Sequence, residues 1–111
     1  MTPLPRLLTA VLILGWLGPA IDAAEPSVDF NNDIRPILSN HCFACHGPDE
    51  EHRDSGLRLD TEEGLFTVVT AGDPATSDLL DRVLATDPDV VMPPPRHHKP
   101  LTKAQQNKLR Q

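Results

Sequence analysis

Two thiols and an imidazole stand within five residues of one another in the segment Cys42-Phe43-Ala44-Cys45-His46, which holds both cysteines of the chain. The C-x-x-C-H spacing is the attachment pattern of c-type haem. On a helix, the two sulfurs lie on one face and can reach the two vinyl groups of one porphyrin, while His46 offers a nitrogen to the iron. The spacing therefore predicts one covalent haem c, attached through Cys42 and Cys45 and ligated by His46.

Three other uses of this segment stay open. A zinc ion could take both thiols with two of His52, His97 and His98, although this spacing matches no common zinc pattern. A reversible dithiol of the thioredoxin kind is expected beside a βαβ pattern, which this proline-broken sequence lacks. A disulfide across two residues closes so small a loop that it adds little stability. Haem is the interpretation that the spacing favours.

A second axial ligand for the iron can be sought by counting. Apart from the initiator Met1, the chain has one methionine, Met92, and it is followed by three prolines that hold the backbone extended and stiff. A thioether opposite an imidazole raises the reduction potential of a haem iron. Met92 could instead fill a gap in the core, and His97 and His98 are its rivals as ligands. We expect Met92 to ligate the iron.

The N-terminus predicts export. Arg6 precedes an apolar run, Leu7 to Leu17, whose length suits a signal peptide and is too short for a membrane span. Small residues follow, and cleavage after Ala23 would leave residues 24–111 as one small haem domain. We expect a signal peptide over residues 1–23, a periplasmic or cell-envelope location, and no stable membrane span after cleavage.

The exported part has few residues from which to build an apolar core. Phe30, Phe43 and Phe66 are its only aromatic residues, and the 12 prolines of the chain leave little room for long helices. A domain of this size has a small margin of stability. A buried porphyrin would supply the missing apolar surface.

Three helix starts position these residues. Asp33 is expected to cap a helix that has Pro36 in its first turn and leads to the cysteines. Asp73-Pro74 marks a second start, followed by leucines and a valine at helical spacing. Thr102 and Gln105 fit a capping box that opens a last helix. The expected fold is all-α, small and loop-rich.

These motifs follow one another as they do in a known family. The runs are VDFNNDIRPILSNHCFACHGPDEEHRDSGLRLDT (28–61), AGDPATSDLL (71–80), VMPPP (91–95) and KPLT (99–102). With them, the sequence resembles a planctomycete-type cytochrome c domain over nearly all of residues 24–111. The resemblance implies a class I-like, mainly helical haem domain, exported and usually the N-terminal module of a much larger protein.

The end of the chain departs from the family's pattern. Family members tend to continue the final helix into an aromatic-containing segment and then into other domains, whereas this sequence ends with LTKAQQNKLRQ (101–111). Two interpretations stay open: an N-terminal fragment that lacks the end of its C-terminal helix, and a stand-alone variant.

Charge is distributed unevenly along the chain. Residues 24–95 hold 15 acidic and four basic side chains, whereas residues 96–111 hold five basic side chains and no acidic ones. An acidic body does not attract nucleic acid or anionic lipid. It could steer a basic redox partner or serve only solubility. The acidic stretch Pro48 to Asp54, beside the haem motif, is the part expected to matter for a partner.

Electron transfer is the function that these features favour. With both axial positions filled, the iron would bind no substrate and would exchange electrons with a redox partner protein or with further domains of a longer parent chain. The alternative is a peroxidase-like haem enzyme or a sensor with an open sixth site, in which Met92 would not ligate. We favour the electron-transfer module and assign no catalytic residue, because the sequence places no Arg or His as a proton donor or acceptor beside that site.

Overall fold

The computed structural model describes residue 18 and residues 27–111. In chain order its helical elements are η1 (Phe30–Ile34), α1 (Arg35–His41), α2 (Phe43–His46), α3 (Glu62–Leu65), η2 (Pro74–Thr76), α4 (Asp78–Leu84), η3 (Pro95–His97) and α5 (Lys103–Arg110). No residue in the described ranges belongs to a β-strand. The prediction of a small all-α, loop-rich domain is confirmed. The predicted signal peptide, residues 1–23, lies outside the described residues apart from Gly18.

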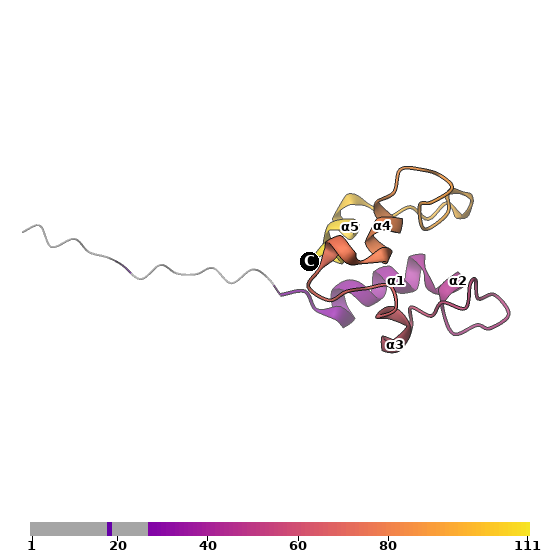
Figure 1. Ribbon diagram of the computed structural model, residues 1–111, viewed down its shortest axis with the longest axis horizontal. Coiled ribbons are helices and arrows are strands. Elements are labelled where there is room, and N and C mark those ends of the chain that lie inside the picture. The colour runs from indigo at the N-terminus through magenta and orange to yellow at the C-terminus, as the bar shows by residue number, and fades with distance from the viewer. Residues whose placement is uncertain (1–17, 19–26) are drawn as a thin grey trace, which may run out of the picture.

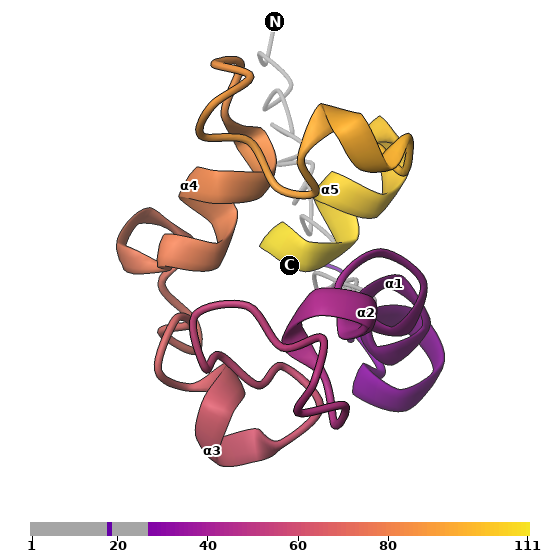
Figure 2. The same cartoon turned by 90° about the vertical axis from the view of Figure 1, so that its right-hand side faces the viewer.

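Helix α5 joins the beginning of the domain to its later part. It packs against α4 and against η1, so the last helix lies beside the first turn (Figure 1). Figure 2 shows the end of α5 near the middle of the molecule, with α4 to one side and α1 below it. The long loops between α2 and α3 and between α4 and α5 complete the fold.

The first helix begins earlier than predicted. The Asp29 carboxylate accepts the Asn32 backbone N–H at 3.0 Å and caps η1, a π-helical turn that runs directly into α1. Asp33 lies inside that turn, where its Oδ2 accepts the Asp29 N–H at 3.0 Å. The prediction that Asp33 caps the helix is therefore wrong, although Pro36 does lie in the first turn of α1. Two aspartates four residues apart give similar capping signals, and the sequence alone does not choose between them.

The second predicted start is split in two. Asp73 caps as expected, because its Oδ1 accepts the Ala75 N–H at 3.1 Å, but the turn that it opens is the short 3₁₀ helix η2. Ser77 then interrupts the helix with extended backbone angles, and α4 starts at the next residue. The Ser77 side chain is buried and accepts the Thr70 N–H at 2.9 Å. This hydrogen bond to an upstream loop fixes Ser77 outside the helix.

The last helix begins as predicted. Gln105 N–H donates to the Thr102 hydroxyl at 3.2 Å, and Thr102 N–H donates to Gln105 Oε1 at 2.8 Å, which completes a capping box. No residue of α5 is buried, so polar contacts help to hold it. Gln106 Nε2 donates to the Val83 carbonyl of α4 at 3.2 Å.

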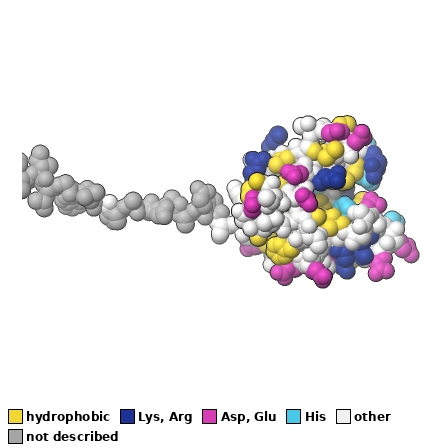
Figure 3. All heavy atoms as spheres, viewed as in Figure 1, with side chains coloured by type: hydrophobic (Ala, Val, Ile, Leu, Met, Phe, Trp, Pro, Cys, Tyr) yellow, Lys and Arg dark blue, Asp and Glu magenta, His cyan; other side chains and the backbone are white. Residues whose placement is uncertain are grey.

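The apolar core is small. Within residues 27–111, the buried apolar side chains are Ile37, Leu38, Leu59, Leu80 and Val83. Two of the three phenylalanines, Phe30 and Phe66, are 46% and 52% exposed. Apolar side chains lie open to solvent among charged ones on the face that Figure 3 shows. The described chain therefore buries little apolar surface by itself, as its composition predicts.

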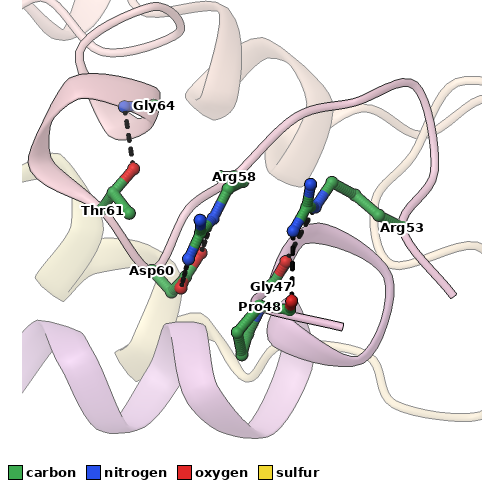
Figure 4. A network of polar contacts seen from close by, with 7 residues as sticks. All are labelled: Gly47, Pro48, Arg53, Arg58, Asp60, Thr61 and Gly64. Atoms are coloured by element: carbon green, nitrogen blue, oxygen red, sulfur yellow. Dashed lines mark hydrogen bonds and ion pairs between the residues drawn. The ribbon is translucent and has the colours of Figure 1, made fainter. Parts of the chain in front are cut away.

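Two arginines organise the loop that follows α2. Arg53 donates to the carbonyl oxygens of Gly47 and Pro48, at 3.0 and 3.1 Å, and so satisfies acceptors at the end of α2 (Figure 4). Arg58 forms a two-pronged ion pair with Asp60. Hydrogen bonds from Arg58 keep the pKa of the Asp60 carboxyl below its usual value. The loop has a defined shape in spite of its lack of regular structure.

Helix α3 passes close to this loop at Gly64. The Thr61 hydroxyl accepts the Gly64 N–H at 3.2 Å and caps the helix. A Cβ atom on Gly64 would overlap the backbone carbonyl oxygen of Arg58. Because a backbone atom cannot move aside as the end of a side chain can, only glycine fits at this position.

Replacing Gly64 should expose this constraint. Gly64→Ala should lower the free energy of unfolding of the haem-loaded protein by roughly 2–3 kcal/mol, because the added methyl group forces a backbone shift. Glu63→Ala, an exposed change on the same helix, should stay within about 0.5 kcal/mol of wild type. Chemical denaturation of the three proteins checks this. Equal stabilities for the two variants would contradict the close approach.

Candidate functional site

The two cysteines and His46 lie on one short helical turn. Cys42 separates α1 from α2, and its carbonyl oxygen accepts the N–H groups of Cys45 at 3.1 Å and His46 at 2.8 Å. The Cys42 N–H itself donates to the Leu38 carbonyl at 2.8 Å. The motif is therefore a continuation of α1, which carries part of the core, and the structure brings its three reactive side chains together on one segment.

The chain after the motif returns to it twice. Asp54 N–H donates to the Cys45 carbonyl and Leu59 N–H donates to the His46 carbonyl, each at 2.8 Å. Gly47 is buried at the end of α2, where a Cβ atom would overlap the Phe43 carbonyl oxygen. These contacts fix the backbone of residues 42–47 from both sides.

Both cysteines are free and half-buried. Burial, with a smaller contribution from the charge of Cys45, raises the pKa of the Cys42 thiol to about 11. Cys42 is therefore a neutral thiol at physiological pH. Dithiol oxidoreductases need the opposite shift, toward a reactive thiolate, so the structure argues against the reversible-dithiol alternative.

The imidazole of His46 carries a buried nitrogen. Its Nδ1 has no hydrogen-bond partner among the described residues. A buried polar atom without a partner costs about 1–3 kcal/mol, and such atoms are found where a function requires them. Two free thiols and this imidazole, fixed at C-x-x-C-H spacing, have the chemistry that covalent haem attachment needs. The residues present fit the cofactor.

A large apolar cavity lies beside this turn. Its volume is about 700 Å³, and Phe43 of the motif lines it together with the buried Leu38, Leu59 and Leu80. Cavities of this size hold cofactors and small ligands. The lining does not include the thiols, His46 or Met92, so the cavity adjoins the motif through Phe43.

A second, more open hollow lies against the motif itself. Phe43, Ala44 and Cys45 line it, and so do His52 and His97 from two later segments. The sequence predicted His97 as a rival of Met92 for the iron and as a candidate zinc ligand, and the structure places it near Cys45. His98 does not line this hollow.

Met92 is half-buried in the loop between α4 and α5. Its N–H donates to the Arg82 carbonyl at 3.0 Å, which fastens the start of the proline run to α4. The peptide bond between Met92 and Pro93 is cis. Met92 lines neither hollow, and its role as axial ligand stays a prediction.

The zinc alternative finds no support in this geometry. It needed the two cysteines and two of His52, His97 and His98 around one ion. Across the described part of the chain, no three side chains of the His, Cys, Asp and Glu types come together as a possible metal site.

One contact near the motif had no signal in the sequence. The ring of His41, the residue before Cys42, lies within hydrogen-bonding distance of the Lys99 carbonyl and the Gln105 side chain, both near the end of the chain. Partners 58 and 64 residues away could not be predicted from local spacing.

Comparison with protein families identifies the domain. The family described as Planctomycete cytochrome C matches residues 42–96, from the first cysteine of the motif to the residue after the proline run. This part of the chain belongs to the planctomycete cytochrome c family. The resemblance seen in the sequence is confirmed, and membership of a cytochrome c family indicates that the domain binds haem. Searches among curated proteins and among solved structures each gave no match.

Over residue 18 and residues 27–111, no helix of the cytochrome domain combines the length and the apolar character that a bilayer crossing requires.

Loss of the attachment cysteines should unfold the domain. Cys42→Ala with Cys45→Ala should lack a cooperative thermal transition, because five buried apolar side chains leave a domain of this size a small margin of stability. Circular dichroism measured against temperature tests this. Ala44→Ser, at an exposed position between the cysteines, should keep both haem and a sharp transition. A sharp melt in the double variant would show that the chain folds without its cofactor.

Proposed function

We propose that this domain is a one-electron carrier. A covalent haem c, held by thioether bonds from Cys42 and Cys45, would supply a single iron that cycles between the ferric and ferrous states. His46 would ligate the iron on one side and Met92 on the other. The domain itself would bind no substrate.

The observation that carries this proposal is the state of the C-x-x-C-H turn. Its thiols are free, and its backbone is fixed because Cys42 N–H donates to the Leu38 carbonyl while Asp54 and Leu59 donate their N–H groups to the turn. His46 Nδ1 is buried and has no partner among the described residues. A rigid turn suits electron transfer, because little has to move when the charge on the iron changes. It also keeps His46 at a constant position relative to the two points of attachment.

Met92 is proposed as the second ligand on its chemistry and on its anchoring. A soft thioether stabilises ferrous iron and raises the potential. The hydrogen bond from Met92 N–H to the Arg82 carbonyl and the stiff prolines that follow restrict the positions that the Met92 side chain can take. Both features suit a ligand that must stay bound in both oxidation states.

Export is proposed with this function. Attachment of haem to two cysteines suits a protein outside the cytoplasm, where a loosely held cofactor could be lost. The electron partner would be a separate redox protein or a further domain of a longer parent chain. The four acidic residues of the Pro48–Asp54 stretch are all exposed and lie next to the motif, whereas Arg53 among them is partly buried. A basic partner surface would therefore be favoured.

A haem enzyme or sensor with an open sixth site is the alternative. The contact in its favour is between His52 and Asp49, whose side chains lie 2.7 Å apart beside the hollow that Cys45 lines. A histidine paired with a carboxylate can transfer protons. Both side chains are more than half exposed, however, whereas catalytic electrostatics are strongest where water is excluded.

Met92→Ala separates the two candidates. Wild-type ferric protein should show the weak sulfur-to-iron charge-transfer band in the far red. The variant should lose the band, and its reduction potential should fall by at least about 0.1 V, within the range of ~0.8 V that axial ligands set. Spectroscopy and redox titration measure both effects. Met92→Ala combined with His97→Ala and His98→Ala controls for replacement of the ligand by a neighbouring imidazole.

The open-site alternative predicts a different result. Wild-type iron would then be high-spin, would take added azide at once, and would be unaffected by Met92→Ala.

A further inference from the structure

His41 reaches across the molecule from the residue before the first cysteine. It ends α1 and is half-buried. Its Nδ1 lies 2.9 Å from the Lys99 carbonyl oxygen, and its Nε2 lies 3.2 Å from Gln105 Nε2. One imidazole therefore contacts both the loop after the proline run and the first turn of α5.

The partners determine which nitrogen of His41 carries the proton. A carbonyl oxygen only accepts, so Nδ1 must donate to Lys99, and an amide nitrogen donates, so Nε2 must accept from Gln105. The orientation of the Gln105 amide is fixed independently, because its Oε1 already accepts the Thr102 N–H at 2.8 Å in the capping box. Neutral His41 with the proton on Nδ1 satisfies both contacts.

These hydrogen bonds hold the far end of the loop that carries Met92. The near end is fastened to α4 by the hydrogen bond from Met92 N–H to the Arg82 carbonyl. At the far end, the Lys99 carbonyl accepts from His41, and Lys99 Nζ lies 3.4 Å from the Asn40 carbonyl. The three prolines between these anchors allow little backbone rotation, so fixing Lys99 also limits where Met92 can lie.

We propose that His41 is a positioning residue, which holds the Met92 loop at a fixed place relative to the attachment motif. His41 is joined through the backbone to Cys42 and through its ring to the loop that follows Met92. It thereby connects the side of the domain that bears His46 to the side that bears Met92. This role rests on the proposed ligation by Met92, and it adds that the ligation depends on a residue that touches neither iron ligand.

Azide binding to the haem-loaded ferric protein tests this role. Azide must displace Met92, so its affinity reports how readily the loop opens. His41→Ala should raise the affinity by about tenfold, as expected for the loss of one to two hydrogen bonds. His41→Asn can still donate from a position close to that of Nδ1, and it should show a smaller rise. His41→Asn also keeps the test available if His41→Ala folds poorly.

Lys103→Ala is the matched control. Lys103 lies in the same first turn of α5 as Gln105, but its side chain is exposed, so the azide affinity should stay within about twofold of wild type. Affinities are to be measured far from the unfolding transition, with the unfolding midpoint recorded for each variant. A purely structural role would lower the midpoint and leave the azide affinity unchanged.

Two outcomes overturn the proposal in distinguishable ways. If the wild type shows the far-red band and His41→Ala binds azide no better, the positioning role fails and the proposed ligation stands. If the wild type lacks the band, ligation by Met92 fails, and the role of His41 fails with it.

Discussion

The structure depends on a direct coupling between the core and the C-x-x-C-H turn. Leu38, whose side chain is 1% exposed, accepts the Cys42 N–H through its carbonyl, and Leu59, also buried, donates its N–H to the His46 carbonyl. The two residues that bury apolar surface on either side of the motif thus also fix its backbone. Because these core residues also hold the backbone of the motif, a more stable core also orders the thiols and the imidazole. A cofactor bound at the C-x-x-C-H turn would in turn stabilise the small core.

Helix α5, which lies outside the apolar core, is held in place by polar contacts. Helix α5 buries no side chain, yet polar contacts join it to three other elements. Gln106 bonds to α4, and Lys108 forms an ion pair of 3.6 Å with Asp33 of η1. Gln105 contacts His41 at the end of α1. Such contacts are directional, so they fix where α5 and the preceding loop lie even though each adds little stability. The domain therefore combines weak overall burial with a well-defined arrangement of the segments around the motif.

The sequence was informative where the determinants are local. The C-x-x-C-H spacing and the capping box at Thr102 each depend on residues within one turn, and the all-α fold follows from helix signals between prolines. Prediction failed at Asp33, where Asp29 offered a competing cap, and at Ser77, which is held out of the helix by a bond to Thr70. Other features depend on residues far apart in the chain, as the contacts of His41 do, and no short pattern encodes them.

The central claim is that Cys42 and Cys45 hold a haem covalently, and the mass of the intact protein tests it most directly. The chain should be expressed with an export signal and haem-attachment machinery, denatured, and analysed by mass spectrometry. The account predicts the polypeptide mass plus one haem, with the colour retained after denaturation. Recovery of only the unmodified polypeptide under those conditions would contradict it.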